Sequence, residues 1–177
     1  MRNEHQPTGY SAAQILLHWL IALLVLFQVS FGEDIAPAYR AMRRDETAGA
    51  DDLFNADLHI YTGLAILALA CLRLAIRLIR GAPPAPESEG ILLRWVAAAV
   101  HLVLYAVIFL MPVTGILAWY LGVGPAGEIH ELGKAVIIIA LALHVAGALW
   151  QHFIAKSDAL VRMLRPGTRG AGHTGAG

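Results

Sequence analysis

Four long apolar stretches, separated by polar segments, dominate the hydrophobic pattern of the chain. They cover roughly residues 14–32, 57–79, 95–121 and 132–154. A helix rises about 1.5 Å per residue, so about 20 apolar residues are needed to cross the ~30 Å hydrocarbon core of a bilayer. Each stretch meets that requirement. The pattern therefore predicts an all-α integral membrane protein, a four-helix transmembrane bundle.

Composition agrees with a membrane location. Of the 177 residues, 58% are hydrophobic, and the mean hydropathy of +0.61 exceeds that of ordinary soluble domains. The first apolar stretch is longer than the roughly 7–15 residues of a signal-peptide core, and Arg2 is the one firm positive charge before it. We therefore expect it to be a retained span. The single cysteine, Cys71, excludes an intrachain disulfide and a thiolate metal cluster within this chain.

The polar segments predict how the spans are connected. The first loop, about residues 33–56, is the longest, and its sequence YRAMRRDE suits a short interfacial helix. The second loop, 81–90, is rich in Pro and Gly, which predicts an extended connector. The third loop, GVGPAGE, is so short that the third and fourth spans must be antiparallel neighbours. We expect one transmembrane domain over 1–166 and a disordered Gly-rich tail over 167–177.

Charge is divided unequally between the loops, although the formal net charge is zero. The first and third loops are rich in acids. The second loop and the C-terminal segment, with the N-terminus, carry most of the basic residues: Arg2, Arg73, Arg77, Arg80, Arg94, Lys156, Arg162, Arg165 and Arg169. Basic loops stay in the cytoplasm, so we expect both termini and the second loop to be cytoplasmic.

Four histidines lie inside or at the edges of the apolar stretches: His18, His59, His130 and His144. An imidazole in a lipid-embedded helix needs a partner, and a haem iron is a strong one. Depth pairs His18 with His144 in the cytoplasmic half, and His59 with His130 near the outer surface. Two bis-histidine haem sites at two depths follow, and such six-coordinate ligation suits one-electron transfer.

Each histidine also has an ordinary structural explanation. His18 could be hydrogen-bonded in a polar pocket of the core, and His59 and His130 could be interfacial residues. A haem-free transporter, whose histidines bind zinc or relay protons, is the alternative from another class. It predicts carboxylates inside the membrane, and no Asp or Glu lies deep in any of the four stretches.

The ordered motifs LLHW, LHIYTG followed by RLAIR, HLVLY with MPVTG, IHELG, and LHVAGALWQHFIAKSDALVRML resemble the bacterial cytochrome b561 family. The resemblance runs from about Tyr10 to Pro166. The cytochrome b subunits of nickel–iron hydrogenases and formate dehydrogenases share that superfamily. It implies a multi-pass protein of the bacterial inner membrane that holds two haem b groups and exchanges electrons with quinone. It also implies that His18 and His144 ligate one haem iron, and His59 and His130 the other.

Other residues have weaker indications. Gln151 and His152 follow His144 on the same helix and could form a wall of a quinone pocket, although the family often has two adjacent histidines there. His101 suits a structural or propionate-binding role better than a ligand role. The row Arg73, Arg77 and Arg80 suits membrane anchoring, with haem propionates as the alternative partner. On the outer side, a further set could attract a small anion: Arg40, Arg43, Arg44 and Lys134.

The leading hypothesis is a di-haem b-type cytochrome that passes single electrons between an outer donor and membrane quinone. Superoxide oxidases, which pass the electron of superoxide to ubiquinone, are free-standing members of the family that this chain resembles. The same electron-transfer chemistry would serve a membrane anchor of a hydrogenase or dehydrogenase complex. We expect lipid, ubiquinone, and superoxide or a periplasmic donor as partners, and no nucleic acid. No catalytic residue is assigned.

Overall fold

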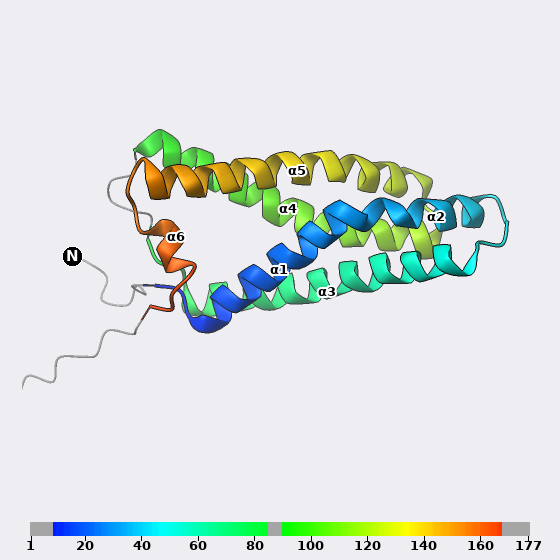
Figure 1. Cartoon of the computed structure of the whole chain (residues 1–177), viewed down its shortest axis with the longest axis horizontal. Coiled ribbons are helices and arrows are strands. Elements are labelled where there is room, and N and C mark those ends of the chain that lie inside the picture. The colour runs from blue at the N-terminus through cyan, green and yellow to red at the C-terminus, as the bar shows by residue number, and fades with distance from the viewer. Residues whose placement is uncertain (1–8, 85–89, 168–177) are drawn as a thin grey trace, which may run out of the picture.

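The computed structural model describes residues 9–84 and 90–167, and all its secondary structure over these residues is helical. Helix α1 (Ala12–Phe31) runs through a short 3₁₀ turn, η1 (Gly32–Ile35), into α2 (Ala36–Arg43). Three helices of about the same length follow: α3 (Ala50–Arg80), α4 (Ile91–Leu121) and α5 (Gly124–Phe153). The short α6 (Ala159–Arg162) completes the fold, which is an elongated bundle (Figure 1).

Four helical segments are long and apolar enough to cross a membrane: Ala12–Arg43, Ala50–Arg80, Ile91–Leu121 and Gly124–Phe153. They contain the four predicted spans apart from Ile154, the C-cap of α5, so the predicted fold class is confirmed. The helices extend beyond the apolar stretches, however, so the non-helical part of the predicted first loop over 33–56 is limited to residues 44–49. Helices η1 and α2 and the first turns of α3 occupy most of it, because its polar residues suit an exposed helix end. The expected helix in YRAMRRDE is present as far as Arg43.

Local sequence explains where the helices begin and end. Ser11 caps α1 in a capping box with Gln14, in which each side chain bonds the backbone of the other. Gly122 ends α4 at φ 65°, a left-handed conformation that residues with a Cβ rarely adopt. Because α5 begins only two residues later, α4 and α5 are antiparallel neighbours, as predicted (Figure 1).

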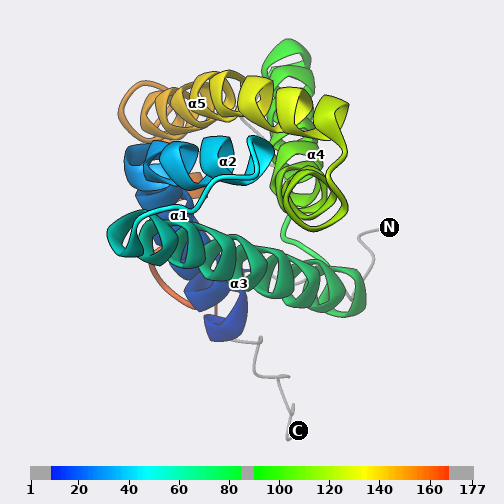
Figure 2. The same ribbon diagram turned by 90° about the vertical axis from the view of Figure 1, so that its right-hand side faces the viewer.

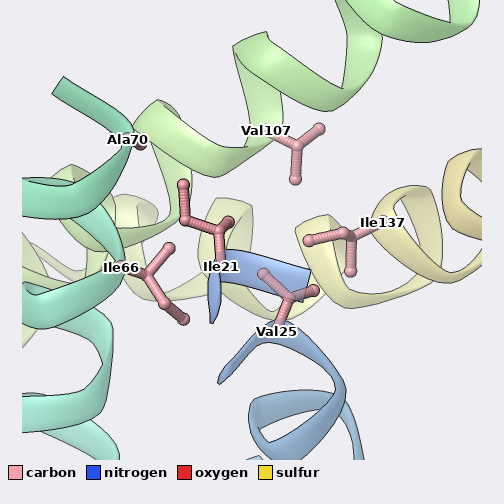
Figure 3. Packing of buried hydrophobic residues seen from close by; sticks show 6 residues of the cluster. All are labelled: Ile21, Val25, Ile66, Ala70, Val107 and Ile137. Carbon is pink, nitrogen blue, oxygen red and sulfur yellow. The ribbon is translucent and has the colours of Figure 1, made fainter. Parts of the chain in front are cut away.

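The bundle consists of two helix pairs. The most extensive packing lies between α4 and α5 and between α1 and α3, whereas α5 makes few close backbone contacts with α1 or α3. In the end view, α2 lies between α3 and α5 (Figure 2). One cluster of buried apolar side chains joins all four long helices (Figure 3): Ile21, Val25, Ile66, Ala70, Val107 and Ile137. Most other large apolar side chains are exposed, as expected where lipid covers the surface.

The two described ends of the chain meet at one end of the bundle. The amide of Gly167 donates a hydrogen bond of 3.0 Å to the carbonyl of Tyr10. The indole of Trp19 donates one of 2.8 Å to the carbonyl of Met163, which holds the segment with α6 against α1. We call this end the inner end and the opposite end the outer end, after their predicted cytoplasmic and outer sides. The predicted disordered tail and most of the Pro-rich connector, residues 168–177 and 85–89, lie outside the described residues.

Candidate cofactor site formed by two histidine pairs

The fold brings the four candidate histidines together as two pairs. His18 of α1 faces His144 of α5, with ring centres 6.1 Å apart. His59 of α3 faces His130 of α5, with ring centres 5.9 Å apart. We call these the inner pair and the outer pair. Each histidine pair joins the helix pair α1–α3 to the helix pair α4–α5. The two residues of each histidine pair lie on helices whose backbones make few close contacts.

The two histidine pairs lie at different depths, as the positions of the four histidines along the apolar stretches predict. On α5, Ile137 is seven residues from both His130 and His144, and it belongs to the apolar cluster. The fourteen residues between the two histidines correspond to a rise of about 21 Å. The aliphatic cluster that contains Ile137, which Figure 3 shows, therefore lies at a depth between those of the inner and the outer pair.

The spacing within each pair fits a metal ion between the two rings. Imidazole nitrogens lie about 2.0–2.1 Å from a first-row metal ion, so two rings on opposite sides of it have their centres roughly 6 Å apart. Both pairs match this spacing. A haem iron needs no further protein ligand than two such nitrogens. Within the described ranges, no group of three or more His, Cys, Asp or Glu is placed to hold a metal ion, so the two-ligand sites fit haem iron better than a protein-only metal site.

The surroundings of the outer pair orient both rings. The Nδ1 of His130 lies 2.8 Å from the carbonyl oxygen of Met111 and 3.3 Å from the hydroxyl of Thr114. Because a carbonyl only accepts, Nδ1 carries the proton and Nε2 is left for a metal. A Cβ at Gly115 would be 3.2 Å from the His130 ring, and one at Gly32 would be 3.4 Å from that of His59. These two glycines therefore leave the space that the rings occupy.

Gln28 is a further residue of the outer pair that sequence patterns did not indicate. Its amide nitrogen donates a hydrogen bond of 2.7 Å to the carbonyl of His59, which ties α1 to α3 at the level of the ring. Its amide oxygen and the Nδ1 of His59 are both buried without a hydrogen-bond partner. Gly63 lies against this amide, because a Cβ there would be 3.5 Å from Gln28 Nε2. The sequence signal that could have indicated Gln28 is an amide side chain within an apolar stretch.

A third imidazole lies beside the inner pair. The ring of His101 on α4 contacts that of His144 with centres 5.0 Å apart, and its Nδ1 lies 2.6 Å from the carbonyl of Ala97. This separation is shorter than the spacing expected across a metal ion. His101 therefore suits a supporting role beside His144 better than a place opposite it, in agreement with the structural role preferred from the sequence.

Two arginines of α3 lie beside the first turn of α1, which precedes His18 of the inner pair. A small cavity of about 10 Å³, the size of one water, is lined by Tyr10, Gln14, Arg73 and Arg77. Arg73 donates to the carbonyl of Gln14 at 3.4 Å, and Gln14 lies one helical turn before His18. The guanidinium of Arg77 lies 5.9 Å from the centre of the Tyr105 ring, whose hydroxyl is buried without a partner.

Two other groups of candidate residues stand apart from the pairs. Gln151 and His152 are half-buried at the end of α5, and the ring of His152 contacts that of Phe153 with centres 4.8 Å apart. At the outer end, Lys134 forms an ion pair with Glu33, and Arg43 donates to the carbonyl of Gly122 at 3.4 Å. Half of the basic set considered for anion attraction is therefore already engaged.

Comparison with known proteins agrees with this arrangement. The family model described as prokaryotic cytochrome b561 matches residues 9–166. The chain belongs to the prokaryotic cytochrome b561 family. It is 37% identical to cytochrome b562 of Cereibacter sphaeroides over 91% of this chain and 98% of that protein. It is 27% identical to the probable superoxide oxidase CybB of Yersinia pestis over the same shares of the two chains.

Family membership and the four helices establish the general character of the molecule. It is a multi-pass bacterial membrane cytochrome whose role is electron transport, and a cytochrome b implies haem b as its cofactor. The resemblance found in the sequence motifs is thereby confirmed.

Gln28 provides a test of how the outer pair is held. We expect Gln28→Ala to lower the stability of the bundle by about 1–3 kcal/mol, because it removes a partly buried hydrogen bond between α1 and α3. Thermal unfolding of the detergent-solubilised protein, followed by circular dichroism, measures the change. Ser30→Ala, an exposed site on the same helix, is the matched control and should leave the midpoint unchanged. Equal midpoints for Gln28→Ala and the control would contradict the role assigned to this amide.

Proposed function

We propose that the protein is a di-haem b-type cytochrome that carries single electrons across the membrane between an outer donor and quinone. The observation that carries the proposal is the pair of bis-histidine arrangements at two depths, with ring centres 6.1 and 5.9 Å apart. His18 and His144 hold one haem, and His59 and His130 hold the other. The two imidazoles of each pair would hold haem b, which would supply an iron centre that takes up and releases one electron.

The residues around the pairs support this role. The Met111 carbonyl fixes the tautomer of His130, so that Nε2 faces the metal position. The aliphatic layer that contains Ile137 excludes water and protons from the region between the pairs. At the inner end, quinone would bind in a pocket to which Gln151 and His152 contribute, because an amide or imidazole N–H can donate to a quinone carbonyl. The donor would approach at the outer end.

Membership in a cytochrome family favours this proposal over the haem-free transporter. The proposal also includes the predicted topology, with both termini and the inner pair on the cytoplasmic side. Basic residues at the inner end and acidic residues at the outer end support that orientation. The proposal likewise includes a single transmembrane domain over residues 1–166.

Haem content tests the assignment of the four ligands. We expect about two haems per chain in the wild type and about one in His18→Ala and in His59→Ala, because each variant removes one axial ligand of one site. The pyridine haemochrome assay and the dithionite-minus-oxidised spectrum measure both numbers. His101→Ala is the control, since it removes an imidazole beside the inner pair that is not a proposed ligand. A colourless wild type, or the loss of one haem in His101→Ala, would overturn the assignment.

A specific outer donor is favoured by one relative. Because the similar protein of Yersinia pestis is described as a probable superoxide oxidase, superoxide is the second element that we propose. Two superoxide ions would give two molecules of dioxygen and two electrons, which reduce one ubiquinone to ubiquinol with two protons. If the chain shares the redox role of that relative but does not use superoxide, its outer electron donor would be a protein.

Superoxide oxidation is tested with the haem-replete protein and a water-soluble ubiquinone analogue. We expect quinol to form in the ratio of one for two superoxide ions consumed, at a rate proportional to protein concentration. His59→Ala should abolish quinol formation, because it removes a ligand from the proposed outer site. Quinol formation that is equal with and without protein would exclude superoxide as the donor and favour a protein donor.

A further inference from the structure

The two rings of the outer pair differ in what their Nδ1 atoms meet. The Nδ1 of His130 donates to the carbonyl oxygen of Met111 at 2.8 Å. The Nδ1 of His59 is also shielded from solvent, but it has no hydrogen-bond partner among the described residues. A ring nitrogen that carries a proton in an apolar bundle needs an acceptor, because it has lost its hydration without compensation. The acceptor for His59 is therefore to be found among the atoms that enclose it.

Gln28 carries an acceptor that is itself unpaired. Its amide oxygen, Oε1, is buried and accepts no hydrogen bond within the part of the chain that the structure describes. The other half of the amide is engaged, since Nε2 donates to the backbone carbonyl of His59 at 2.7 Å. This bond determines which way the amide faces, because the carbonyl accepts from Nε2 and could not pair with Oε1. The backbone carbonyl of Gln28 is engaged by the amide of Gly32, so Oε1 is the acceptor that this residue has left.

The unpaired donor and the unpaired acceptor lie beside the same glycine. A Cβ at Gly32 would be 3.4 Å from the Nδ1 of His59 and 3.8 Å from the Oε1 of Gln28. On the other helix, Gly63 lies one turn after His59, and a Cβ there would be 3.5 Å from the Nε2 of the same amide. The His59 ring and the Gln28 amide are thus neighbours between α1 and α3. The two glycines leave room for the amide and the ring to adjust to each other.

We propose that Gln28 is a positioning residue that holds His59 through two hydrogen bonds. Its Nε2 donates to the backbone carbonyl of His59, as in the structure, and its Oε1 accepts from the Nδ1–H of the ring. This inference rests on the proposed function, in which the Nε2 of His59 faces the position between the two outer rings. A neutral imidazole oriented in this way carries its proton on Nδ1, and the Gln28 oxygen is the acceptor for that proton.

One amide can restrain both the backbone and the ring of His59, because its donor and its acceptor lie side by side on one planar group. The outer pair then has an acceptor for each ring. The backbone carbonyl of Met111 on α4 serves His130 of α5, and the side chain of Gln28 on α1 serves His59 of α3. Each helix pair of the bundle therefore supplies one histidine of the outer pair and the group that orients it.

Two variants test whether the amide oxygen of Gln28 matters. Gln28→Leu removes the donor and the acceptor, whereas Gln28→Glu keeps an acceptor oxygen in either protonation state. Loss of a hydrogen bond to a metal-bound imidazole commonly weakens metal affinity about 10–100-fold. We therefore expect haem-replete Gln28→Leu to lose one of its two haems to excess apomyoglobin about 10–100-fold faster than the wild type does. Gln28→Glu should remain close to the wild type, and Ser30→Ala, at an exposed site on the same helix, is the matched control.

Electron paramagnetic resonance of the oxidised protein distinguishes positioning of the ring from general support of the bundle. The outer low-spin signal, identified as the one that His59→Ala abolishes, depends on the orientation and hydrogen bonding of its two imidazoles. We expect this signal to shift in Gln28→Leu, to remain closer to the wild type in Gln28→Glu, and to be unchanged in Ser30→Ala. The inner signal should stay the same in all three variants.

A measurement on the wild type keeps the test decisive if a variant fails to fold. In the reduced, haem-replete protein, labelled with ¹⁵N at histidine and glutamine, we expect a nuclear Overhauser contact between the Nδ1–H of His59 and the amide protons of Gln28. His59→Ala and Gln28→Leu, where they fold, identify the two partners by the loss of their signals.

The outcomes separate this inference from the function on which it rests. The role of Gln28 would be overturned, and the di-haem function left intact, by two haems whose release and outer signal are the same in Gln28→Leu as in the wild type. Equal effects of the Leu and Glu variants, or the absence of the Overhauser contact, would overturn it as well. A wild-type protein with fewer than two haems would contradict the di-haem function itself.

Discussion

The structure depends on the need to satisfy imidazole rings inside a membrane. Water cannot hydrate a ring nitrogen in hydrocarbon, so a buried histidine requires a hydrogen-bond acceptor, a metal or a charged partner. Here two helix pairs, α1 with α3 and α4 with α5, approach one another chiefly through an aliphatic cluster at mid-depth. On either side of that cluster, histidines from the two helix pairs face each other at a separation that fits a metal ion. In the proposed function, a haem held by each histidine pair would join the two halves of the bundle.

This arrangement accounts for features that packing alone leaves unexplained. Gly32 and Gly115 lack side chains where the rings of the outer pair lie. The Met111 carbonyl accepts a hydrogen bond from the Nδ1–H of His130. Around the inner pair, His101 and Arg73 approach from two other helices. The aliphatic cluster lies between the depths of the two pairs, and in the proposed function it would separate the two haems without any opening of the bundle.

Much of this architecture could be predicted because it depends on one-dimensional patterns. Four apolar stretches specify four helices, and the positions of His18, His59, His130 and His144 along them specify two depths. The short Gly-rich link before α5 makes α4 and α5 neighbours. These features require only the length of a helix and the thickness of a bilayer.

The remainder depends on tertiary geometry. The hydrogen bond of Gln28 to the His59 carbonyl joins residues on two helices, and neither apolar stretch encodes the rotation that brings them together. The contact of His101 with His144 likewise depends on how α4 packs against α5. The extent of α2 has a different reason: its short sequence, APAYRAMR, has no membrane pattern. The helix is held by Tyr39, whose ring stacks on that of Trp119 with centres 6.2 Å apart.

The central claim is that each histidine pair holds one haem iron, and anomalous scattering at the iron absorption edge from crystals of the haem-replete protein tests it most directly. The account predicts two iron peaks for each chain, one between His18 and His144 and the other between His59 and His130. A single peak, or an iron bound by His101 in place of His18, would contradict it.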